Sequence, residues 1–197
     1  EHKEANLESN QREILSSVFR SQLPQIKKVE FNVETQALGE NGAPIMITQS
    51  EYMRRMKEMA NIQAGMSFYG EMPNMYNLVL NADHKLVKQV LTDADNSCKA
   101  ALEPIESEMA NLNNRRKELQ KAQEGKKTED IPQAEKDELN DIEKKISDET
   151  TKKQAVLGEY ANGNKIIHQL IDLALLQNNM LKGEALTNFV KRSIELI

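Results

Sequence analysis

The sequence predicts an α+β domain in which helices flank a small three-stranded sheet and an antiparallel coiled-coil hairpin is inserted. Three observations lead to this prediction. Short segments with alternating apolar residues lie in the first half, two heptad-patterned segments follow, and two strongly apolar segments end the chain. Of the 197 residues, 39% are hydrophobic and 4% are aromatic. Because this apolar content is low for one compact globule, we expect part of the chain to be elongated and solvated.

The first half of the chain changes from a helical period to a strand period. Residues 10–23 carry apolar side chains at helical spacing and end before a proline, which predicts a helix. Residues 29–33 read VEFNV, and this alternation predicts a half-buried strand. A turn-rich segment then leads to the apolar run 44–48, which we expect to pair with the first strand as a hairpin. A third strand is predicted at 75–81, and Asn81 is expected to cap the helix that follows.

A methionine-rich segment, EYMRRMKEMANIQAGM, occupies residues 51–66 between the second and third predicted strands. Met53, Met56 and Met59 are three residues apart, so they share one face of a helix. For an arbitrary helix, such a stripe most often belongs to a core. The alternative is a partner-binding surface, because the flexible thioether adapts to varied partners.

Two segments with a heptad repeat lie in the second half of the chain. Apolar residues step by three and four through 102–119 and again through 139–160, and a segment with glycine and proline separates them. This pattern predicts an antiparallel helical hairpin. We therefore divide the chain into a core (1–95), an inserted hairpin (96–160) and two terminal helices (161–197), and we expect the hairpin to be a separate, weakly coupled unit.

The last two predicted helices carry more apolar surface than they can cover by themselves. Residues 166–176 are apolar on nearly all sides, which requires burial on several faces. The final helix carries one apolar stripe. A partner subunit is the simplest cover for this surface.

Composition and motifs exclude several classes of function. A net charge of −5 without a basic patch makes nucleic acid a poor partner, and no apolar run is long enough to predict a membrane span. The single cysteine, Cys98, excludes an internal disulfide and fits a reducing compartment. His2, His84 and His168 are scattered, so no metal site is predicted, and no phosphate-binding loop is present. The chain also begins without methionine, and we expect it to be a fragment of a longer protein.

Three short motifs, in this order of elements, resemble the C-terminal domain of the heat-shock protein 90 chaperone family. They are YMRR from Tyr52, LNADHKLV at 80–87 and LIDLALLQNNML at 170–181. The resemblance covers about residues 10–95 and 161–197. The sequence departs from the family pattern at Ala82, where the family usually has proline, and in the hairpin that precedes the terminal helices.

The resemblance implies a domain that forms homodimers through a four-helix bundle, with two helices from each subunit. It also implies that Met53, Met56 and Met59 contact client proteins, which are unfolded or partly folded. The implied dimer-interface residues lie on the last two helices: Ile167, Leu170, Ile171, Ala174, Leu175, Leu176, Phe189, Val190 and Ile194.

By the same resemblance, ATP and Mg are bound by an N-terminal domain outside this chain, so we expect no cofactor and no enzyme activity here. The parent protein would be a cytoplasmic, ATP-dependent chaperone of the stress response that assists protein folding. The alternative is a structural or adaptor module of the coiled-coil class, whose 96–160 hairpin binds a partner.

Overall fold

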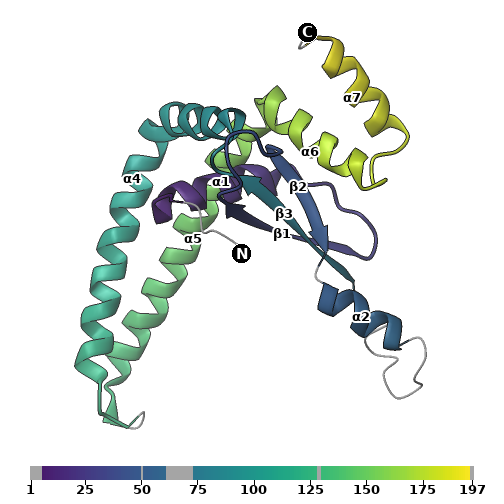
Figure 1. Cartoon of the computed structure of the whole chain (residues 1–197). Helices are drawn as coiled ribbons and strands as arrows, with labels where there is room; N and C mark the ends of the chain where they lie inside the picture. The colour runs from purple at the N-terminus through teal and green to yellow at the C-terminus, as the bar shows by residue number, and fades with distance from the viewer. Residues whose placement is uncertain (1–5, 50, 61–72, 128–129, 196–197) are drawn as a thin grey trace.

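The computed structural model of the chain describes residues 6–49, 51–60, 73–127 and 130–195. These residues form a small sheet flanked by helices, from which a long hairpin extends (Figure 1). The elements are α1 (Ser9–Ser21), β1 (Val29–Gln36), β2 (Ile45–Gln49), α2 (Glu51–Ala60), β3 (Asn74–Asn81), α4 (Lys85–Gln123), α5 (Gln133–Gly163), α6 (Lys165–Gln177) and α7 (Glu184–Glu195). The predicted α+β class and three-stranded sheet are confirmed.

The sheet has the strand order β1-β3-β2, with β3 parallel to β1 and antiparallel to β2. Leu78 of β3 therefore lies opposite Val33 on one side and Ile47 on the other. The expected hairpin between the first two strands is wrong, because β3 separates them. The last four residues of β3 are all buried, which is typical of a central strand.

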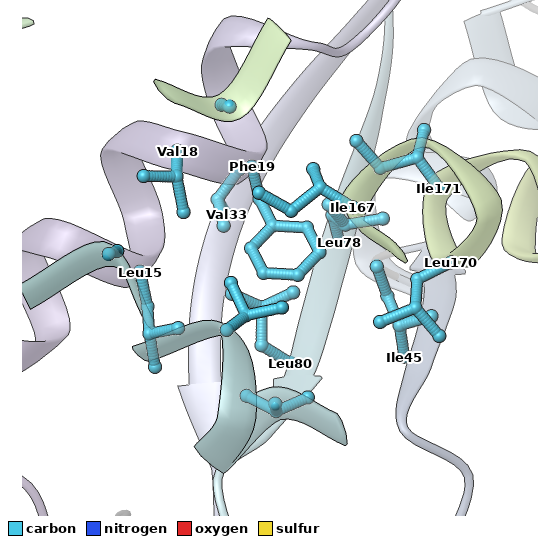
Figure 2. Packing of buried hydrophobic residues seen from close by; sticks show 14 of the residues in the cluster. Leu15, Val18, Phe19, Val33, Ile45, Leu78, Leu80, Ile167, Leu170 and Ile171 are labelled. Carbon is cyan, nitrogen blue, oxygen red and sulfur yellow. The ribbon is translucent and has the colours of Figure 1, made fainter. Parts of the chain in front are cut away.

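The core lies between the sheet and the helices α1 and α6. Figure 2 shows Phe19 of α1 among Val33, Leu78 and Leu80 of the sheet. On the other side of the cluster, Leu170 of α6 lies beside β2. The N-terminal helix and the penultimate helix are therefore parts of one core.

Asn81 is fully buried at the end of β3 and holds the loop that follows β1. Its Oδ1 accepts hydrogen bonds from the backbone N–H groups of Leu38 and Asp83, both at 3.1 Å, and its Nδ2 donates to the carbonyl of Gly39 at 2.9 Å. The expectation that Asn81 caps the next helix is wrong. His84 is the N-cap of α4, and its Nδ1 accepts from the backbone N–H two residues later at 3.2 Å.

The inserted segment forms the predicted antiparallel hairpin, in which α4 leads outward and α5 returns (Figure 1). Leu119 and Ile142 are buried on the seam that the heptads predict. α4 contains Pro104 and changes direction between the sheet and the tip. A proline inside a helix removes one backbone hydrogen bond and is a common cause of such a bend.

The base of the hairpin belongs to the main core. Cys98, Leu102, Leu157 and Ala161 are buried in the same cluster as the inner faces of α1 and α6. The expectation of a separate, weakly coupled hairpin is therefore wrong for its base. Nor does a helix end at residue 96 or 160, because α4 begins at the sheet and α5 continues to Gly163.

One buried lysine joins the hairpin to the N-terminal helix. Lys153 of α5 is 5% exposed, and its Nζ lies 3.0 Å from Glu13 Oε2 of α1 and 3.1 Å from Glu106 Oε1 of α4. Asn10 Oδ1 of α1 lies 3.3 Å from the same ammonium. A single positive charge thus holds three helices together just outside the apolar base.

We predict that removing the two carboxylates destabilises the chain more than removing the lysine. In Glu13→Gln/Glu106→Gln the ammonium stays buried without a counter-ion, which costs about 3–5 kcal/mol. In Lys153→Met, Glu13 keeps access to water because its side chain is 51% exposed, and Glu106, whose side chain is 38% exposed, can turn its buried oxygen toward water. Urea unfolding measures both variants, and an equal or opposite ranking would contradict a structural role for the ion pairs.

Candidate interaction surfaces

The methionine stripe lies on α2, which projects from the end of β2 away from the core (Figure 1). Met59 is 45% exposed, Met53 and Met56 are half-buried, and none of the three belongs to the core cluster. The part of the methionine-rich segment at 61–66 lies outside the described residues. The core interpretation of the stripe thus finds no support in the described part of the chain, while the client role stays a prediction.

Ion pairs along α2 favour the helical form of this exposed segment. Arg55 pairs with Glu51 at 2.5 Å, and Arg54 pairs with Glu58 at 2.6 Å, both at the i,i+4 spacing. Each such pair stabilises an exposed helix by about 0.3–0.5 kcal/mol. α2 therefore presents apolar thioethers on a helix that also carries ion-paired charged side chains and the exposed Tyr52.

Five of the nine residues predicted for the dimer interface are buried inside the chain itself. Their exposed fractions are between 0 and 4%, and they belong to the core cluster: Ile167, Leu170, Ile171, Ala174 and Leu175. The sheet and α1 thus supply much of the cover that the apolar character of α6 requires. The interface prediction narrows to Leu176, Phe189, Val190 and Ile194, which retain exposed surface.

α7 has a well-defined apolar face but buries none of its residues. Leu186, Val190 and Ile194 recur every four residues and are 36%, 49% and 69% exposed. We call these three residues the outer stripe. The site prediction omitted Leu186, although its i,i+4 spacing to Val190 was visible in the sequence.

A polar network attaches α7 to α6. Gln169 Oε1 of α6 accepts from Arg192 Nε at 3.2 Å, and its Nε2 donates to Ser193 Oγ at 2.6 Å. The same arginine forms a short ion pair with Asp172, and the Ser193 hydroxyl donates to the carbonyl of Phe189 at 2.9 Å. We call Gln169, Asp172, Arg192 and Ser193 the α6–α7 latch.

An exposed ion pair adds to the contact between these helices. Lys165 Nζ lies 2.7 Å from Glu195 Oε2, and this hydrogen bond lowers the pKa of the Glu195 carboxyl. Because the folded-state pKa is lowered, the contribution of this pair to stability is present at neutral pH and is lost as the pH falls through that pKa. Both side chains are solvated, so the effect is small.

The described residues offer little for catalysis. Cys98 is buried, and this burial raises the pKa of its thiol, which opposes formation of a nucleophilic thiolate. His84 serves as a helix cap, and His168 Nε2 lies 3.0 Å from the carbonyl of Asn162. Within the described ranges, no three His, Cys, Asp or Glu side chains are grouped to hold a metal, and no helix is long and apolar enough to cross a membrane.

Comparison with known proteins gives three informative relatives. Chaperone protein HtpG of Bacteroides fragilis is 68% identical over 97% of this chain and 28% of that protein. HtpG of Bacteroides thetaiotaomicron is 64% identical over 99% of the chain, and HtpG of Porphyromonas gingivalis is 43% identical over all of it, each across 29% of the relative. No family model and no solved structure matches the chain.

The chain spans less than a third of the length of these relatives. The match to Bacteroides fragilis HtpG extends over 191 residues, or 97% of this chain, and 68% of these positions are identical. The positions that are not identical are fewer than the residues of the hairpin (96–160), so the match includes hairpin residues. The hairpin is therefore present in that relative and is not peculiar to this chain. The chain belongs to the heat-shock protein 90 family and corresponds to the C-terminal region of the HtpG chaperones.

Proposed function

We propose that this chain is the homodimerisation and client-contact segment of an ATP-dependent chaperone that binds unfolded proteins and assists their folding. The observation that carries the proposal is the exposed outer stripe on a helix that buries none of its own residues. The methionine stripe on α2 provides a second apolar surface of a different kind. The similarity to the HtpG chaperones is the reason for assigning both surfaces to a chaperone.

In the proposed dimer, α6 and α7 of one copy pack against α6 and α7 of a second copy. A two-fold axis brings the same surface of both copies together, so the outer stripe and Leu176 would meet their own counterparts. The inner face of α6 remains in the core of its own chain. The four-helix arrangement then buries only the apolar side chains that the single chain leaves exposed.

The methionine stripe suits clients that share no sequence. Unbranched thioethers adopt many shapes at little cost, so one surface can fit varied apolar segments. Met59 and Tyr52 are the large side chains most open to such contact on the described part of α2. Binding and hydrolysis of ATP with Mg are assigned to a part of the parent protein outside this chain, and the location is proposed to be the cytoplasm.

The alternative function, an adaptor whose hairpin binds a partner, receives less support. In the described part of the hairpin, no large hydrophobic side chain is exposed, and the surface is densely charged. A partner would therefore bind the described part of the hairpin mainly through polar contacts. The presence of the hairpin in Bacteroides fragilis HtpG keeps this alternative open.

Shortening the hairpin separates the two functions. Because Cys98, Leu102 and Leu157 belong to the core, the deletion should spare the base and remove only residues 110–148, with a short Gly-Ser linker in their place. We expect a full-length parent with this deletion to dimerise and to protect unfolded protein from aggregation as the unmodified parent does. Loss of protection with normal folding and dimerisation would favour the adaptor function.

For the dimer, we predict that Val190→Glu weakens association while the single chain stays folded. The carboxylate is harmless on an exposed helix, where substitutions change stability by about 0.5 kcal/mol or less. Buried in the interface it lacks a partner and costs several kcal/mol, and each 1.4 kcal/mol weakens binding about tenfold. Sedimentation analysis over a range of concentrations measures the change in dissociation constant.

Two comparisons make the dimer test specific. Asn188→Glu adds the same charge on the side of α7 away from the outer stripe and should leave the mass of the dimer unchanged. Leu175→Glu is unsuitable, because Leu175 is buried in the chain's own core and the variant would unfold. Equal association of the Val190→Glu and Asn188→Glu variants would exclude the outer stripe from the interface.

For client contact, we predict that replacing Met53, Met56 and Met59 with glutamine reduces capture of unfolded protein by the full-length parent. The apolar area that a client would bury is removed, whereas the melting temperature should change little because none of the three is buried. Light scattering of an aggregating client measures capture. Met109→Gln on the hairpin is the matched control. A large loss of thermal stability in the triple variant would show that the methionine stripe packs in the core and would contradict the client-contact proposal.

A further inference from the structure

α7 has two neighbouring faces, one that contacts α6 and one that carries the outer stripe. Phe189, Arg192 and Ser193 lie on the face toward α6 and are half-buried, whereas the outer stripe is more exposed. Successive residues of an α-helix are rotated by about 100°. The centre of the outer stripe therefore lies about a quarter turn from the side that contacts α6.

A quarter turn is a small rearrangement for a short terminal helix. If α7 rolled by this amount, the outer stripe would pack against α6 of the same chain, and the exposed apolar surface would be buried without a second copy. The hydrophobic effect has no direction and favours this intramolecular burial as much as burial in a dimer. Phe189, which packs against the core in the observed orientation, opposes the roll in part, and a polar interaction between α6 and α7 opposes it as well.

The α6–α7 latch has the geometry to do this. The guanidinium of Arg192 contacts Gln169 through Nε and Asp172 through a second nitrogen, so its planar group is fixed on both sides. Ser193 Oγ accepts from Gln169 and donates to the backbone of α7 itself, so both of its hydrogen-bonding roles are fulfilled. Arg192 and Asp172 are only 18% and 20% exposed in their side chains.

Rolling α7 would break these bonds together. Gln169 and Asp172 would then lie beneath apolar side chains without the partners that they have now, and an unpaired polar group under apolar cover is unfavourable. Charge-assisted bonds at partly buried positions are also stronger than exposed pairs. The latch thus opposes the rotation that the apolar side chains favour.

We propose that Gln169, Asp172, Arg192 and Ser193 are positioning residues that set the rotation of α7 and keep its outer stripe available to a second copy of the chain. The consequence for dimerisation rests on the function proposed above, whereas the rotation itself is a property of the single chain. The latch would act against self-burial of the interface.

The test replaces the polar contacts with apolar ones and follows the exposure of the outer stripe. Val190→Cys is introduced as a thiol probe, and its rate of maleimide labelling is measured in dilute, monomeric protein. Buried Cys98 reports global unfolding in the same experiment. We expect Asp172→Leu/Arg192→Leu, which removes both members of the ion pair, to slow labelling at residue 190 several-fold, to keep or raise the melting temperature, and to weaken dimerisation at least tenfold.

Control variants distinguish rotation from detachment. An Asn188→Cys probe lies on the side of α7 away from the outer stripe and should label at the same rate with and without the latch. Arg192→Lys keeps a charge for Asp172 and should restore part of the labelling rate and of the dimer affinity. Unchanged or faster labelling at residue 190 in the double-leucine variant would overturn the proposal, because α7 would then have kept its orientation or come away from α6.

The two proposals can fail separately. If the unmodified chain is monomeric at every concentration, the dimer is excluded, and the labelling rates still decide whether the latch sets the rotation. If the chain dimerises and the double-leucine variant dimerises equally well, the dimer stands and the latch is excluded as a positioning device.

Discussion

Burial of the inner face of α6 against the sheet and α1 is the interaction on which the rest of the structure depends. Ile167, Ile171 and Leu175 are almost fully buried there, and burying each such side chain contributes about 1.5–3 kcal/mol. Because α6 is committed to its own core, α7 can only attach to its outer side. The free apolar surface of the terminal helices is therefore confined mainly to α7.

The local elements of this fold could be predicted from the sequence, but their partners could not. Alternation identified the strands, whereas the pairing of β1 with β3 depends on long-range packing that no local pattern encodes. The apolar circumference of α6 likewise predicted burial correctly. Burial of α6 by its own chain and burial by a second subunit require the same apolar pattern, so the sequence does not distinguish them. In this structure the sheet buries much of α6.

The same distinction applies to the charged residues of the hairpin seam. Lys153 stands at a heptad position, where a charge predicts a weak seam. The structure instead surrounds it with carboxylates from two other helices, one of them 140 residues earlier in the chain. On the surfaces, the methionine stripe lies outside the core cluster, with Met59 exposed and Met53 and Met56 half-buried, whereas five of the nine predicted interface residues are buried in the chain's own core.

The junction between α5 and α6 has a mechanical consequence. Only Asn164 separates the two helices, and its side-chain oxygen caps α6 by accepting from the backbone N–H groups of Ile166 and Ile167 at 2.9 and 3.1 Å. Because a single residue joins the two helices, a movement of α6 is passed to the base of α5, where Leu157 and Ala161 are buried in the same core. Beyond Lys153, α5 projects as an arm of residues 133–152, about 30 Å long. A tilt of that base by about 5° displaces the tip of the hairpin by about 3 Å.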